Sequence, residues 1–150
     1  MQEAGPATAR HTEGVITLDL ARRLRAVGLE WTPGSGDRFV VPDRGMDEDV
    51  FVLSDMTVEV HEVPTGRVIG FNGTVEWALD SLEEHEVLWM PREDQLRDLL
   101  GRRFLRLEGV PGGFAVEIDT QDLDGVEQRH VDIDAERAYA RAVLAVLGEP

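Results

Sequence analysis

Residues 104–134 read FLRLEGVPGGFAVEIDTQDLDGVEQRHVDID, and this stretch decides the fold. Two runs rich in apolar and β-branched residues, 104–108 and 114–119, predict strands that a glycine-rich turn joins. Asp124-Gly125 is typical of a hairpin turn and leads into a third predicted strand at 126–133. Because the connections are short hairpin loops, we expect the three strands to form an antiparallel sheet.

A helix is predicted directly after this sheet. Asp134 can cap its N-terminus, and Gly148 can end it. The residues between them repeat apolar side chains at helical spacing, which predicts a wide apolar face. That face comprises Ala135, Ala138, Tyr139, Ala142, Val143, Val146 and Leu147.

The first two thirds of the chain add further helices and strands. Three helices are predicted, at 17–28, 74–82 and 91–101. The second would place Val75, Leu79 and Leu82 on its inner face. The third has Pro91 at its first position, where proline is favoured. The predicted strands are 38–41, 50–53, 57–63 and 67–71. This order of elements predicts an α+β fold, with antiparallel sheet or sheets and helices packed on one face.

The length of the chain, 150 residues, favours one domain. We expect residues 1–14, which lack periodicity, to be a disordered tail or a start-site extension, and residues 15–150 to form a single compact domain. No apolar run approaches the ~20 residues that span a bilayer. The N-terminus also lacks the apolar region of a signal peptide. These features predict a cytoplasmic protein that does not bind membranes.

Composition excludes several kinds of chemistry. All 15 basic residues are arginine, and there is neither lysine nor cysteine. The chain therefore has no phosphate-loop lysine, no Schiff-base lysine, no thiol nucleophile and no thiolate metal site. With 30 acidic residues the net charge is −15, which argues against direct binding of nucleic acid.

The negative charge is unevenly placed along the chain. Residues 43–90 hold twelve acidic residues against two arginines, a net charge of −10. Residues 111–150 hold nine against three, a net charge of −6. The middle of the chain therefore carries most of the charge and indicates an acidic surface.

Metal-site motifs are incomplete. His61-Glu62 and His85-Glu86 lack the second histidine, four residues on, that a zinc protease needs. The segment from Asp119 to Gly125 resembles a calcium loop but fails at its first and last ligand positions. We expect a turn with solvated carboxylates there, and no bound cofactor or metal.

Nucleophile and nucleotide motifs are also incomplete. The glycines around Ser35 lie one residue away instead of two, so they do not form a nucleophile elbow. Gly34 and Gly36 lack the third glycine of a dinucleotide-binding loop. The sequence thus offers no catalytic motif, and a non-enzymatic role is expected.

Aromatic residues leave two interpretations open. Trp31, Trp77 and Trp89 can form one core layer together with Phe39, Phe51 and Phe71. Alternatively, one or two of the tryptophans are partly exposed at an acidic rim, where they would anchor a basic partner.

Five segments resemble a family of small acidic actinobacterial proteins, and the likeness covers about residues 15–148. The segments are LDLARRL at 18–24, WTP at 31–33, GDRFVVPD at 36–43, FNGTVEWAL at 71–79 and WMPREDQL at 89–96. Members of that family are sometimes labelled pilus assembly protein of the CpaE type, which implies a receiver-like domain joined to a nucleotide-binding ATPase. This chain is too short for both parts and has no glycine-lysine phosphate loop, so the resemblance implies a compact domain and no ATP binding.

The leading hypothesis is a non-enzymatic accessory domain that binds a basic protein partner through an acidic surface. The candidate residues of that surface are Trp31, Asp47, Glu48, Asp49, His61, Trp77, Glu83, Glu84 and Trp89. The alternative is a small-molecule or metal-binding domain, possibly enzymatic, whose pocket Asp37, Arg38, His61 and Trp77 would line. A third hypothesis is mimicry of nucleic acid by rows of carboxylates. The oligomeric state is open, since a flat edge strand can pair two copies while high charge keeps chains apart.

Overall fold

A computed structural model of the chain describes residues 15–42, 49–53, 87–123, 125 and 127–149, and the course of the main chain at 7–10, 58–63, 66–71 and 81–83. The chain divides into two compact units. The first unit comprises Met1–Thr12 and Trp31–Met90, and the second comprises Glu13–Glu30 and Pro91–Pro150. The chain therefore passes from the first unit to the second, returns, and crosses again.

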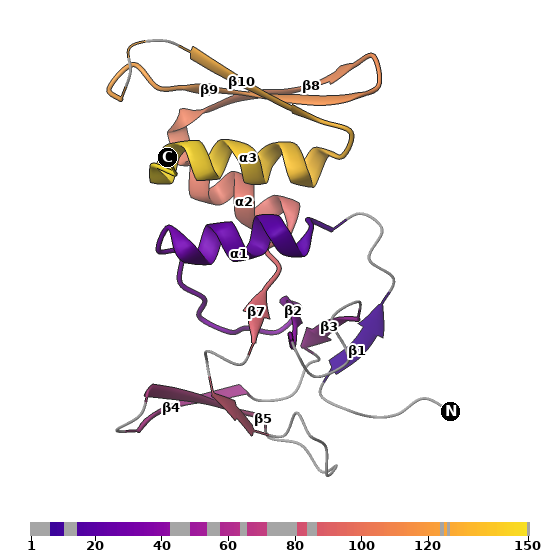
Figure 1. Ribbon diagram of the computed structural model, residues 1–150, viewed down its shortest axis with the longest axis vertical. Helices are drawn as coiled ribbons and strands as arrows, with labels where there is room; N and C mark the ends of the chain where they lie inside the picture. The colour runs from indigo at the N-terminus through magenta and orange to yellow at the C-terminus, as the bar shows by residue number, and fades with distance from the viewer. Residues whose placement is uncertain are drawn as a thin grey trace. The chain divides into compact units, whose positions relative to one another are not determined.

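The described residues of the first unit form two antiparallel sheets (Figure 1). One has the strand order β1-β3-β2-β7, and the other has the order β4-β5-β6. The strands of the first sheet are β1 (Ala7–Arg10), β2 (Arg38–Val40), β3 (Val50–Leu53) and β7 (Leu88–Trp89). Those of the second are β4 (Val58–Val63), β5 (Gly66–Phe71) and β6 (Ser81–Glu83).

The part of the second unit that the structure describes combines three helices with a three-stranded antiparallel sheet of order β10-β9-β8 (Figure 1). The strands are β8 (Phe104–Val110), β9 (Gly113–Asp119) and β10 (Glu127–Asp132). The helices are α1 (Leu18–Ala26), α2 (Glu93–Leu100) and α3 (Ala135–Leu147), and a short 3₁₀ turn, η2 (Gly101–Arg103), joins α2 to β8.

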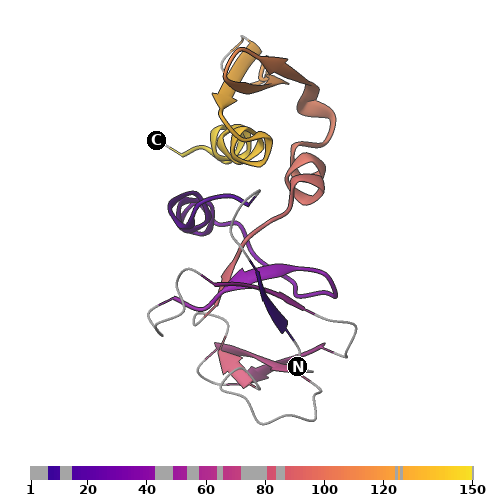
Figure 2. The same cartoon turned by 90° about the vertical axis from the view of Figure 1, so that its right-hand side faces the viewer.

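Helix α3 is the centre of the second unit. It packs on β9 and β10 on one side and contacts both α1 and α2, as Figures 1 and 2 show. Val116 and Ile118 of β9 are fully buried, as is Ala142 of α3. The aromatic rings of Tyr139 and Phe104 pack together with their centroids 5.6 Å apart. The predicted α+β fold, with helices packed on one face of an antiparallel sheet, is confirmed.

The predicted helix boundaries in this unit follow from local capping. The Oγ1 of Thr17 accepts a hydrogen bond from the backbone N–H of Leu20 at 3.1 Å, which begins α1. Asp134 does the same for α3, since its Oδ1 accepts from Glu136 N at 2.9 Å. Gly148 ends α3 in the left-handed conformation, with φ of 88°, which glycine adopts without a steric penalty.

Three predictions of local structure differ from the observed fold. Leu82, predicted in a helix over 74–82, instead lies in β6 opposite Ile69. Strand pairing outweighs the helical pattern, which rested on three apolar residues. Positions 74–80 of the predicted helix lie outside the described residues. Ala7–Arg10, predicted in a tail, pairs with β3 as β1. Helix α2 begins at Glu93 rather than Pro91, because the side-chain Oε1 of Gln95 accepts from Arg92 N at 2.9 Å and fixes Arg92 as the N-cap.

The part of the chain that the structure describes contains no helix long and apolar enough to cross a bilayer.

Candidate interaction surface

An aromatic layer crosses the first sheet. Phe39 of β2 lies opposite Phe51 on one side and opposite Trp89 on the other, so the three residues form one cross-strand row. The rings of Phe39 and Phe51 are stacked with centroids 5.6 Å apart. Trp31 covers the row, since its ring lies 5.9 Å from that of Phe39 and stacks on Trp89 at 6.4 Å. Trp31, Phe39 and Phe51 therefore belong to the predicted core layer, and Trp89 extends it as a half-buried residue. The side chains of Phe71 and Trp77, the other predicted members, lie outside the described residues.

Trp31 is held in the core by a polar contact. Its indole Nε1 donates to Oδ2 of Asp37 at 2.8 Å, and the same oxygen accepts from the backbone N–H of Gly34 at 3.0 Å. Both side chains are buried, with 6% of each residue exposed. Trp31, predicted as a surface anchor, is thus a core residue, because its one polar atom is satisfied inside the protein.

Asp37 has a structural role in the first unit that was not predicted from the sequence. It was expected to line a ligand pocket, yet its carboxylate closes the turn that carries the chain from Trp31 into β2. Its backbone takes part as well, because Asp37 N donates to Gly34 O at 3.1 Å and Asp37 O accepts from Leu53 N at 2.9 Å. The signal available in the sequence was a buried-type aromatic residue six positions before an aspartate in a Pro/Gly turn.

Trp89 reaches the surface of the first unit. It lies in β7, stacked on Trp31, and is half-buried. Its indole Nε1 is buried and has no hydrogen-bond partner among the described residues. Of the predicted anchors, Trp89 therefore combines a packed ring with partial exposure, while Trp77 lies outside the described residues.

The described acidic candidates lie on strands or at their ends. Asp49 is exposed and directly precedes β3. His61 of β4 and Glu83 of β6 are both register partners of Val68 in β5, which places the two positions in one row across the second sheet. Asp47, Glu48 and Glu84 lie outside the described residues.

The two units differ in net charge. The first unit holds 14 acidic residues against four arginines, a net charge of −10, and the second holds 16 against eleven, a net charge of −5. Four arginines cannot neutralise 14 carboxylates one to one, so the first unit keeps a high negative charge however its side chains are arranged. Such a field attracts basic partners and repels acidic ones.

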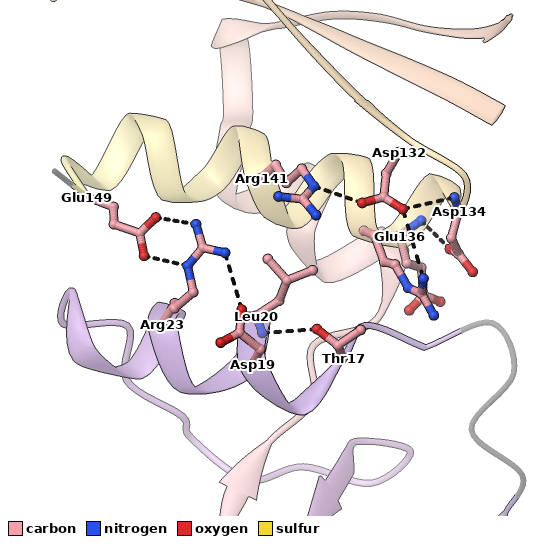
Figure 3. Close-up of polar contacts among 10 residues, drawn as sticks. Thr17, Asp19, Leu20, Arg23, Asp132, Asp134, Glu136, Arg141 and Glu149 are labelled. Carbon is pink, nitrogen blue, oxygen red and sulfur yellow. Dashed lines mark hydrogen bonds and ion pairs between the residues drawn. The ribbon is translucent and has the colours of Figure 1, made fainter. Parts of the chain in front are cut away.

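The second unit balances much of its charge internally. Among its described residues, seven carboxylates form ion pairs with arginines. Figure 3 shows Arg23 of α1 between Glu149 and Asp19, donating to Glu149 at 2.8 Å through Nε and at 2.6 Å through Nη2. The hydrogen bonds from Arg23 hold the pKa of Glu149 below its usual value. On β10 and α3, Asp132 accepts from Arg141 at 2.7 Å (Figure 3).

The loop that resembles a calcium site uses its carboxylates differently. Asp122 pairs with Arg103, whose Nη1 and Nη2 donate to it at 2.6 and 2.8 Å, and this lowers the pKa of Asp122. Asp119 accepts from the backbone N–H of Gln121 at 3.0 Å. These carboxylates face an arginine and a turn, and the described residues contain no group of three or more His, Asp or Glu that could hold a metal ion.

Of the four predicted members of the alternative pocket, Asp37 and Arg38 are described in full. The Asp37 carboxylate is buried and bonded to Trp31 and Gly34, so it is engaged in the fold rather than presented to a ligand. Arg38 lies next to it in β2, and the positions of the His61 and Trp77 side chains are outside the described structure.

Comparisons with models of protein families, with curated proteins and with solved structures found no match to this chain.

Proposed function

We propose that this protein is a non-enzymatic interaction protein of the cytoplasm, and that it binds a basic protein partner through its acidic first unit. One observation carries the proposal: the first unit has a net charge of −10 with only four arginines, while the second pairs seven of its carboxylates with its own arginines. An uncompensated acidic surface steers a basic partner into contact and selects against acidic ones.

Trp89 supplies the apolar part of the proposed contact. Charge complementarity mainly sets association rate and specificity, whereas buried aromatic anchors supply much of the binding energy. Trp89 is half-buried and stacked on Trp31, so its ring is already ordered before binding. Trp31 itself is not part of the proposed surface, because it is buried. The other members remain Asp47, Glu48, Asp49, His61, Trp77, Glu83 and Glu84.

The test is capture of partners on the immobilised full chain at two salt concentrations. Between about 0.1 M and 1 M salt the Debye length falls from about 10 Å to about 3 Å, so an electrostatic partner is released. We expect a basic protein that is retained at low salt and lost at high salt. Absence of any retained protein, or retention that salt does not change, would contradict the proposal.

Two variants localise the contact. The triple variant Asp47→Asn, Glu48→Gln, Asp49→Asn removes three charges from the first unit, and we expect it to weaken capture of that partner. The matched control, Glu30→Gln, Asp98→Asn, Glu127→Gln, removes three exposed charges from the second unit and should leave capture unchanged. Equal capture by the triple variant and the parent chain would place the contact elsewhere.

A further inference from the structure

The two edges of the β8–β10 sheet differ in regularity. In β8 the pairing with β9 shifts register between Phe104 and Arg106, a bulge that distorts this edge. Strand β10 instead pairs with β9 in unbroken register over six residues, from Glu127 to Asp132. Within the described residues no strand pairs with the other side of β10 (Figure 1). A regular, unpaired edge is a template for another strand.

Exposed apolar side chains gather at the end of this edge. Val131 of β10 is 51% exposed, and Ile133, in the connection to α3, is 71% exposed. Val131 lies opposite Ala115 of β9, next to the pair Arg129 and Glu117, so it stands on the sheet face away from α3. Large apolar residues on an edge strand favour pairing with another strand when nothing opposes it.

The charged side chains Arg129 and Asp132 of β10 do not prevent another strand from pairing with this edge. Charged side chains usually protect an edge strand because burying them unpaired is costly. Here Arg129 forms ion pairs with Glu108 and Glu117, and Asp132 forms one with Arg141 at 2.7 Å. A strand approaching this end of β10 would therefore meet Arg129 and Asp132 already compensated within the sheet and α3, while the exposed Glu127 stands at the other end of the strand.

We propose that β10 pairs with β10 of a second copy of this chain, antiparallel, across a two-fold axis. An isologous contact needs a surface that complements itself. Val131 and Ile133 meet this requirement, because antiparallel pairing brings the apolar residues of both copies together. The flanking charges are internally paired and call for no oppositely charged partner.

The dimer joins the two sheets into one of six strands. A two-fold axis beside Val131 sets Val131 against Val131 of the second copy and limits the pairing to residues 129–133. These five residues span about 17 Å, which is small beside a standard protein interface. The association is therefore weak and depends on concentration. It also strengthens with salt, because both copies are acidic and screening reduces their repulsion.

Sedimentation of the full chain over a range of concentrations tests this contact. We expect a monomer–dimer equilibrium that Val131→Asp weakens about tenfold or more, since it places one negative charge on each copy where the two Val131 side chains met. The control is Leu123→Asp, because Leu123 is 52% exposed but lies in the loop after β9. A chain that stays monomeric at all accessible concentrations, or a dimer that both variants weaken equally, would overturn the proposal.

A second test does not depend on how well the aspartate variant folds. The chain has no cysteine, so a single introduced thiol reports one contact without background. Val131→Cys should give disulfide-linked dimers on mild oxidation, whereas Leu123→Cys should give few. Equal cross-linking of the two variants would show random encounter and refute pairing through β10. The proposal is independent of the acidic surface of the first unit, whose binding should weaken with salt instead.

Discussion

Replacing Asp37 by alanine should destabilise the first unit more than its size suggests. The substitution removes the acceptor of two hydrogen bonds, from Trp31 Nε1 at 2.8 Å and from Gly34 N at 3.0 Å. It leaves a polar indole N–H in a site where only 6% of Trp31 is exposed. A buried donor without an acceptor costs about 1–3 kcal/mol, and a bond to a charged group is worth about 1.5–3 kcal/mol.

The two contacts differ in burial, so their costs differ. The Trp31 contact is buried, whereas the Gly34 contact is only partly so and water can replace the lost acceptor. We therefore expect Asp37→Ala to lower the free energy of unfolding by about 2–4 kcal/mol, most of it from Trp31. Asp37→Asn keeps a side-chain carbonyl that can accept one of the bonds, and should recover part of the loss.

Tryptophan fluorescence is the natural assay, because Trp31, Trp77 and Trp89 all belong to the first unit. Urea unfolding followed at the tryptophan emission therefore reports that unit. The control is Asp49→Ala, which removes an exposed carboxylate from the same unit and should change stability by less than about 0.5 kcal/mol. An Asp37→Ala transition that coincides with that of Asp49→Ala would refute the structural role of the Asp37 carboxylate.

Two further predictions concern the second unit, whose helices are followed by circular dichroism. Burial, and next the charge of Arg141, lower the pKa of His130 in the folded chain below its usual value of 6.5. At a pH between the folded and the unfolded pKa of His130, the unfolded chain therefore binds more protons than the folded chain. Acidification from about pH 7 into that range should destabilise the unit. His130→Gln should flatten this slope, and an unchanged slope would contradict it. Gly113→Ala would drive a methyl group into the backbone of Asp132 and Ile133, and should cost about 1–3 kcal/mol. The control, Gly109→Ala, has no atom within 4 Å of the added carbon, and equal losses in the two variants would refute the steric argument.

Local chemistry made much of the second unit predictable. Thr17, Asp134 and Gly148 each determine a helix end through their own side chain or backbone conformation, so a short stretch of sequence suffices. The strands around Asp124-Gly125 follow in the same way, because hairpins pair residues that are close in the chain.

Two strands of the first unit were not predicted, because they form by pairing with segments that are distant in the sequence or lack a local signal. Leu82 is a strand residue because β5 lies beside it, and Ala7–Arg10 is a strand because β3 does. No feature within either segment signals its partner. The division into two units is equally non-local, since it depends on the chain leaving the first unit at Glu13–Glu30 and again after Met90.

The candidate surface was predictable in charge but not in its anchors. Net charge depends on counts alone, which is why the acidic middle of the chain reappears in the first unit. Whether a tryptophan is core or surface depends on which polar group meets its indole N–H. For Trp31 that group is Asp37, and the turn PGSGD at 33–37 does not show by itself that its aspartate turns back to the tryptophan.

The unequal charge of the two units gives their proposed contacts opposite responses to salt. The first unit, at −10, attracts a basic partner, and screening weakens that contact. The second pairs its strand charges internally, so what opposes its self-association is the overall repulsion of two acidic chains, and screening strengthens that contact. One salt titration of a mixture of chain and partner can therefore separate the two contacts. If both weaken together, then charge also holds the β10 contact, and Arg129 is not neutralised by Glu108 and Glu117 in the way the geometry requires.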